Sequence, residues 1–110
     1  SLTIWRFSDG KAGHDSQTIG LVKALSEQRD CHCHELTCPS LPISACHYLS
    51  GHFPAGQSLP DPDLIIGAGH KTHLPMLAAH RARGGKTIVL MKPSLPLSWF
   101  DLCLIPEHDQ

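Results

Sequence analysis

The sequence predicts a Rossmann-like α/β domain with three layers and a mainly parallel sheet of about five strands. Short apolar segments alternate along the chain with longer segments whose apolar residues recur at helical spacing. This alternation is typical of parallel strands joined by crossover helices. Several of the apolar segments are nearly unbroken, as expected for strands that are buried on both faces of a sheet.

The first predicted strand covers residues 2–7 (LTIWRF), which are apolar and rich in β-forming side chains. A glycine-containing loop follows at residues 8–17. We expect Asp15 or Ser16 to cap a helix that ends near Arg29. The apolar face of this helix is predicted from side chains at helical spacing: Ile19, Leu21, Val22, Ala24 and Leu25.

The middle of the chain is predicted to contain one more strand and an irregular segment. Residues 31–38 (CHCHELTC) alternate in character along the chain, which indicates a strand. Residues 39–60 contain several prolines and glycines and show little regular pattern. We therefore expect a surface segment there, with at most a short helical turn at residues 46–50.

The second half of the chain repeats the alternation of strand and helix. Residues 63–69 (DLIIGAG) predict a strand, and residues 72–83 predict a helix. Pro75 is compatible with the first turn of that helix, where backbone donors have no partner to lose. Gly84 is expected to end the helix in a left-handed conformation. Two further buried strands are predicted at residues 86–92 and 102–106.

Composition limits the class of protein. A length of 110 residues favours one domain, and 41% hydrophobic with 17% charged residues is typical of a globular chain. The formal net charge is −1 and no basic stripe is present, so we expect no nucleic-acid partner. No run of 18 apolar residues occurs, so no transmembrane segment is predicted.

The cysteines and the chain ends suggest where such a protein is found. Five cysteines form an odd number without the spacing of a disulfide scaffold, which favours a reducing, cytoplasmic setting. The chain starts at Ser1 rather than at methionine, and it stops just after an apolar segment. We therefore expect residues 1–110 to be one domain at the N-terminal side of a longer protein.

Loops at the carboxyl ends of the strands are the expected location of a ligand site, because open parallel sheets bind ligands at that edge. Four loops qualify: residues 8–14, 67–73, 92–94 and 106–109. They would bring a group of charged and titratable side chains to one rim: Asp9, Lys11, His14, His70, Lys71, Lys92, Glu107, His108 and Asp109.

The segment GAGHKT has the properties of an anion site. Gly67 and Gly69 allow a sharp turn and a close backbone approach, the following helix offers free N–H groups, and Lys71 adds positive charge. The alternative is that both glycines only let the chain leave the sheet tightly. The candidate ligand- or phosphate-binding residues are Gly10, Lys11, Gly13, Gly67, Gly69, His70, Lys71, Thr72, Lys92 and Ser94.

Candidate catalytic residues come from two of the same loops. His14 or His108 could act as a general base if a neighbouring carboxylate oriented the imidazole. The loops supply Asp9 beside the first histidine and Glu107 or Asp109 beside the second. The candidate catalytic residues are therefore His14, Asp9, Glu107 and His108. The alternative for each is an ordinary loop residue that satisfies a turn or a helix end.

Several familiar sites are disfavoured. The dinucleotide fingerprint would need a small residue at Thr72 and an acid where Lys92 stands, so NAD binding is not expected. The GGKT segment at residues 84–87 precedes a strand rather than a helix, unlike a phosphate-binding Walker loop. No serine has the context of a nucleophile elbow. Cysteine and histidine alternate at residues 31–38 without a paired C-x-x-C, so no metal site is expected.

Three segments together resemble the mitochondrial-fission ELM-type family, whose plant member is associated with mitochondrial division. They are residues 5–25 (WRFSDGKAGHDSQTIGLVKAL), 62–85 (PDLIIGAGHKTHLPMLAAHRARGG) and 89–109 (VLMKPSLPLSWFDLCLIPEHD). Residues 31–60 lie outside this resemblance. The family is similar to GT-B glycosyltransferases, in which two Rossmann-like domains face each other across a cleft. An epimerase description also exists, but the glycine pattern of this chain does not support it.

The resemblance implies an acceptor-side N-terminal domain of a GT-B-like glycosyltransferase, inactive alone. No cofactor is expected in this chain, and a nucleotide sugar would be held by the C-terminal domain of the full-length protein. The implied partners are that domain and a sugar or lipid acceptor, with peripheral membrane association compatible with a cytoplasmic protein. The alternative is a non-catalytic interaction module that uses the segment PSLPLSWF, with Trp99 and Phe100, as its partner surface.

Overall fold

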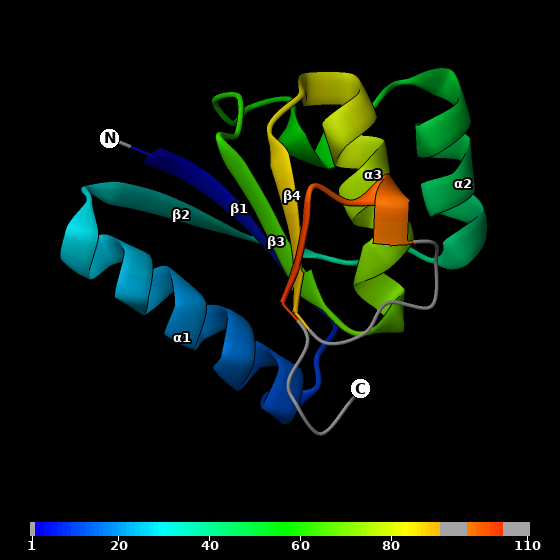
Figure 1. Cartoon of the computed structure of the whole chain (residues 1–110). Helices are drawn as coiled ribbons and strands as arrows, with labels where there is room; N and C mark the ends of the chain where they lie inside the picture. Colours follow the sequence, from blue (N-terminus) through cyan, green and yellow to red (C-terminus); the bar gives the residue numbers. More distant parts are fainter. Residues whose placement is uncertain (1, 91–96, 105–110) are drawn as a thin grey trace.

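A computed structural model describes residues 2–90 and 97–104, which form a five-stranded sheet between helices (Figure 1). The strands are β1 (Leu2–Ser8), β2 (Cys31–Thr37), β3 (Leu64–Ala68), β4 (Lys86–Leu90) and β5 (Leu102–Leu104). The helices are α1 (Ala12–Gln28), α2 (Leu41–Ser50) and α3 (His70–Arg83), with short 3₁₀ segments η1 (Pro54–Gly56) and η2 (Leu97–Trp99). The predicted α/β fold class is confirmed.

All strand pairs are parallel, and the strand order is β2-β1-β3-β4-β5. Strand β1 therefore has β2 on one side and β3 on the other. Its register pairs Ile4 with Cys33 of β2 and with Leu64 of β3. The direction of strand order reverses between β1 and β3. In sheets of this type, the crevice at the carboxyl ends of these two strands is the usual ligand position.

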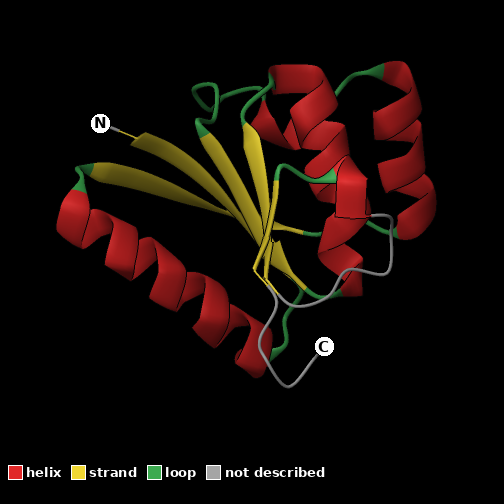
Figure 2. Ribbon diagram, in the orientation of Figure 1, coloured by secondary structure: helices red, strands yellow, loops and turns green. Residues whose placement is uncertain are grey.

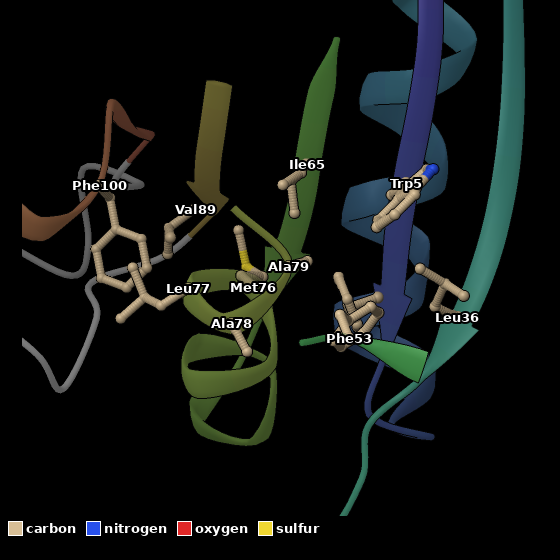
Figure 3. Close-up of a cluster of buried hydrophobic side chains, with 11 residues drawn as sticks. Trp5, Leu36, Phe53, Ile65, Met76, Leu77, Ala78, Ala79, Val89 and Phe100 are labelled. Carbon is tan, nitrogen blue, oxygen red and sulfur yellow. The ribbon is translucent and has the colours of Figure 1, made fainter. Parts of the chain in front are cut away.

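Helix α1 covers one face of the sheet, while α2 and α3 lie on the other (Figure 2). The larger core lies on the side of α3, where Trp5 and Ile65 of the sheet form one buried cluster with Met76 and Leu77 of that helix (Figure 3). Phe7 belongs to the same cluster. A smaller cluster of Ile4, Ile66 and Ile88 contacts Leu21, Val22 and Leu25 of α1. These two clusters hold the carboxyl ends of β1 and β3 in fixed positions.

Helix α1 begins earlier than predicted. It starts at Ala12, because Gly10 takes a positive φ of 82° and Asp9 accepts a hydrogen bond from the Lys11 N–H, which turns the chain into the helix. The buried face was also predicted too widely. Ile19 is 51% exposed and Ala24 is exposed, because the sheet contacts only the stripe that contains Leu21, Val22 and Leu25.

The expectation of an irregular segment at residues 39–60 was wrong, since helix α2 occupies residues 41–50. Pro42 stands at the start of the helix, where it costs no backbone hydrogen bond. Gly51 ends the helix in a left-handed conformation with φ 71°. The following segment returns to the molecule through Phe53, which is buried against Trp5 and Phe7.

Helix α3 begins at His70, two residues before the predicted start. Pro75 is therefore inside the helix rather than in its first turn, and it lacks the N–H that would reach the Lys71 carbonyl. Gly84 has a positive φ of 80° at the helix end. The strands predicted at residues 86–92 and 102–106 are confirmed as β4 and β5, apart from their last two residues, which lie outside the described ones.

Arg83 at the end of α3 fixes the loop that follows α2. Its guanidinium donates to the carbonyls of Gly56 and Leu59, pairs with Asp61 at 2.6 Å, and lies 5.3 Å from the centre of the Trp5 ring. Gly56 is buried directly against Trp5. A Cβ atom at Gly56 would lie 2.9 Å from Cζ3 of the indole, so this position requires glycine.

Candidate functional site

Arg6 of β1 anchors the first turn of α1 at the carboxyl edge of the sheet. The side chain is buried, and its Nη1 donates to Asp15 Oδ1 at 3.2 Å and to Thr18 Oγ1 at 3.0 Å. Its Nη2 pairs with Glu35 of β2. The Ser8 hydroxyl donates to the second oxygen of Asp15 at 3.1 Å. These bonds fix the end of β1 and the start of α1 relative to each other.

This anchoring places Asp9 and His14 in direct contact. Asp9 Oδ2 lies 2.6 Å from His14 Nδ1, with the Asp9 side chain 1% exposed and that of His14 21% exposed. Burial alone would raise the pKa of Asp9. Hydrogen bonds from His14 and from the Lys11 N–H, helped by the nearby positive charge of Lys11, outweigh burial and hold this pKa below its ordinary value. Asp9 is therefore a carboxylate at neutral pH.

The pair has the arrangement of an oriented general base. A carboxylate that faces Nδ1 of a neutral imidazole holds the ring proton on that nitrogen. The lone pair of Nε2 is then free to accept a proton from a substrate. We name Asp9 and His14 the acid–base pair. Its position between β1 and β3 is the crevice at which ligands bind in this strand order.

The loop after β3 closes on the acid–base pair from the other side. Gly69 has φ 97°, and a Cβ atom there would lie 2.5 Å from both Asp9 Oδ2 and His14 Nδ1. Gly67 has a different role, since a Cβ atom there would lie 2.6 Å from Met76 Sδ and 2.9 Å from Thr72 Cβ. Gly67 therefore lets α3 pack on the sheet, and Gly69 lets the backbone approach the acid–base pair.

A groove of about 590 Å³ lies beside this crevice, between the loop that follows β2 and the first turns of α3. Its described lining includes Cys38 and Ser40 from that loop, Lys71 and Leu74 from α3, and Trp99 from η2. The Cys38 thiol donates to the Ser8 carbonyl at 3.3 Å. Burial, with the negative charge of Asp9, raises the pKa of Cys38 to about 11, so the thiol is protonated at neutral pH.

His73 forms part of the inner wall of this groove. It is 3% exposed, and its ring lies 5.5 Å from the Phe100 ring and 5.9 Å from the His70 ring. Burial, with a smaller contribution from His70, lowers the pKa of His73 to about 4. The imidazole is therefore neutral in the folded protein at physiological pH.

This lowered pKa predicts an acid-sensitive stability. Between pH 6.5 and about 4, an unfolded chain takes up a proton at His73 that the folded chain does not. The free energy of unfolding should therefore fall by roughly 2 to 3 kcal/mol between pH 7.5 and 4.5, measured by urea unfolding. His73→Gln should flatten the dependence, while the exposed His32→Gln should not. An equal pH dependence in wild type and His73→Gln would contradict the assignment.

The match to a protein family covers almost all of the chain. The family model described as "Mitochondrial fission ELM1" matches residues 12–110. The chain belongs to this family. The ELM1 family match includes residues 31–60, which the sequence motifs had left out.

A curated relative of this ELM1-family chain is "Uncharacterized protein RP120" from Rickettsia prowazekii (strain Madrid E). The two are 29% identical over 115 residues, which cover 98% of this chain and 32% of the relative. The chain therefore spans about a third of the length of that protein. No solved structure matches the chain.

The structure of the ELM1-family chain brings together part of the predicted site. The loops at residues 8–14 and 67–73 meet, as predicted, and Asp9, His14 and Gly69 are in contact. His70 and Lys71 are exposed at the groove. Lys11 takes part through its N–H, and Gly10 and Gly13 have open space around them. Thr72 is buried and donates to the Gly69 carbonyl at 2.8 Å.

Five predicted residues lie outside the described part of the chain: Lys92, Ser94, Glu107, His108 and Asp109. Within residues 2–90 and 97–104, no group of three or more His, Cys, Asp or Glu side chains could hold a metal ion. In the same residues, no helix has the length and apolarity needed to cross a bilayer.

The residues predicted for the site did not include Cys38, Ser40 and His73 of its second wall, and Trp99 of that wall was predicted only as a partner surface. Cys38 follows β2, so its position at a carboxyl strand end was a usable signal. Ser40 was hidden because α2 was not predicted. His73 follows His70 by three residues on the same helix, which places both on one face.

Proposed function

We propose that this ELM1-family chain is the acceptor-binding N-terminal domain of a GT-B-like glycosyltransferase. The observation that carries this proposal is the acid–base pair, a buried carboxylate 2.6 Å from a partly exposed imidazole at the switch point of a parallel sheet. Transfer of a sugar to a hydroxyl needs a base at the acceptor, and this pair is suited to that step.

In this proposal, the acceptor hydroxyl lies beside Nε2 of His14. Its oxygen forms a bond to the anomeric carbon of the donor sugar, while the bond from that carbon to the nucleoside diphosphate breaks. The nucleoside diphosphate leaves with the bonding electron pair, and the hydroxyl proton passes to Nε2. Asp9 stabilises the imidazolium that forms. The donor would be held by a second domain, so this chain supplies one wall of the cleft.

A second candidate function is an interaction module without catalysis, and the exposure of Trp99 favours it. Trp99 is 54% exposed, and exposed aromatic side chains are frequent anchors of protein interfaces. Phe100 does not contribute to such a surface, because it is buried against His73. This candidate leaves the contact between Asp9 and His14 without a role.

Calorimetry on the natural protein at its full length tests the transferase proposal. Titration with UDP- and GDP-sugars should give saturable heat for at least one donor, in the micromolar to millimolar range that is usual for enzyme substrates. The same donor should be hydrolysed slowly in the absence of an acceptor, which is measured as released nucleoside diphosphate. Absence of both heat and hydrolysis with every donor would overturn the proposal and favour the interaction module.

A further inference from the structure

The groove beside the acid–base pair combines apolar surface with the ammonium group of Lys71. Pro39, Leu74 and Pro75 contribute apolar surface, and the half-exposed Trp99 stands at one end. A volume of about 590 Å³ is within the range of small-molecule sites, roughly 300–1,000 Å³. The groove is therefore large enough for a ligand with an extended apolar part.

The charge of the groove is positive. Lys71 lies in its lining, is exposed, and has no carboxylate partner among the described residues. The buried Arg6, by contrast, is paired with Asp15. None of the described residues that line the groove is acidic. Lys71 would therefore form a charge-assisted hydrogen bond with the anionic head of a ligand, and a neutral ligand would not form it.

The groove also lies next to the loop that carries Asp9. Cys38 lines the groove, and its thiol donates to the carbonyl of Ser8, the residue before Asp9, at 3.3 Å. A ligand that fills the groove at Cys38 would therefore have one end near the start of this loop.

We propose that the groove binds a single-chain anionic amphiphile, with its apolar chain along Leu74 and Trp99 and its phosphate or carboxylate head at Lys71. The role of this ligand as the sugar acceptor rests on the transferase proposal above; its binding does not. The head at Lys71 would place a neighbouring hydroxyl of the ligand toward His14.

Dodecyl phosphate, used below its micelle concentration, is a suitable probe for the full-length natural protein. Trp99 is half exposed and Trp5 is fully buried, so binding should shift the emission of Trp99 to shorter wavelength. Lys71→Gln should weaken binding roughly tenfold, by loss of a charge-assisted hydrogen bond. Lys86→Gln is the matched control, because Lys86 is exposed at the opposite, amino end of β4, and it should leave binding unchanged.

Ligand variants test the role of the Lys71 cation and the role of the apolar wall separately. Dodecyl maltoside should bind at least tenfold more weakly than dodecyl phosphate, and inorganic phosphate alone should not bind at millimolar concentration. Dodecanoate should bind like dodecyl phosphate. Equal binding of the neutral detergent would show that the cation has no role, and equal binding of inorganic phosphate would show that the apolar wall has none. Either outcome overturns the proposal.

Protein variants locate the probe. Calorimetry should show weaker binding by roughly tenfold for Trp99→Ala and no change for Tyr48→Ala. Tyr48 lies in a neighbouring hollow, lined also by His80 and Arg81, and Trp99 lines both the hollow and the groove. Weaker binding by Tyr48→Ala would therefore place the ligand in that hollow and overturn the proposal. His14→Ala should retain binding of dodecyl phosphate even where it abolishes sugar transfer. Failure of the transferase proposal is therefore distinguishable from failure of this one.

Discussion

On the transferase proposal, replacing His14 with alanine should lower kcat for sugar transfer by the full-length protein by about 10²- to 10⁴-fold, the usual contribution of a general base. The affinity for the donor should not change, because this domain would supply only the acceptor side. The measurement is initial-rate kinetics with the donor that calorimetry identifies. His32→Ala is the matched control, because His32 is exposed on β2 and lies outside the crevice.

Asp9→Asn tests whether Asp9 acts by orienting the imidazole. Asparagine keeps the size of the side chain but can present its amide N–H to Nδ1, which would favour the tautomer with the proton on Nε2. The rate should therefore fall although His14 is intact.

A His14→Ala variant that keeps its kcat while circular dichroism shows an intact fold would remove the acid–base pair from the mechanism.

Replacing Gly56 with alanine is expected to destabilise the fold by about 3 kcal/mol, at the upper end of typical overpacking costs. The added methyl group would overlap the six-membered ring of Trp5, which is fully buried and is held between Phe53 and Arg83. Arg83 also bonds to the Gly56 carbonyl, so the loop cannot move away without losing that contact. Urea unfolding at neutral pH measures the change in the free energy of unfolding.

Two further variants make this result specific. Gly20 lies in an exposed turn of α1, and a Cβ atom added there would have no neighbour within 4 Å. Gly20→Ala should therefore be neutral or stabilising by up to about 1 kcal/mol. Trp5→Phe removes the ring that would be overlapped, so the double variant with Gly56→Ala should lose less than the sum of the single losses. Additive losses would show that the cost has another origin.

Much of the architecture could be predicted because it depends on local patterns. Strand β4 ends in the unbroken apolar run of residues 88–90, and that property needs no knowledge of the rest of the chain. Helix α2 could not be predicted in the same way. Its proline, Pro42, and its serines favour irregular structure locally. It is held by contacts with α3 and by the burial of Phe53, which are both tertiary.

The candidate site, too, could be predicted from the sequence only in part. Parallel strands deliver their following loops to one edge, so Asp9, His14 and Gly69 could be placed together from sequence. The sequence also offered Asp9 as the partner of His14, but the contact itself depends on Arg6, which ties the start of α1 to β1. The role of Gly67 was equally hidden, since its contact with Met76 exists only after α3 has folded onto the sheet.

The position of β1 between β2 and β3 has a consequence for biosynthesis. The ribosome makes residues 2–8 first among the described strands, yet one flank of this strand pairs with residues 64–66. Until those residues leave the exit tunnel, the nascent chain carries an apolar strand whose backbone groups are open along that flank. Such a strand invites contact with other nascent chains. We therefore expect β1 to complete its pairing only after residues 64–66 have left the ribosome.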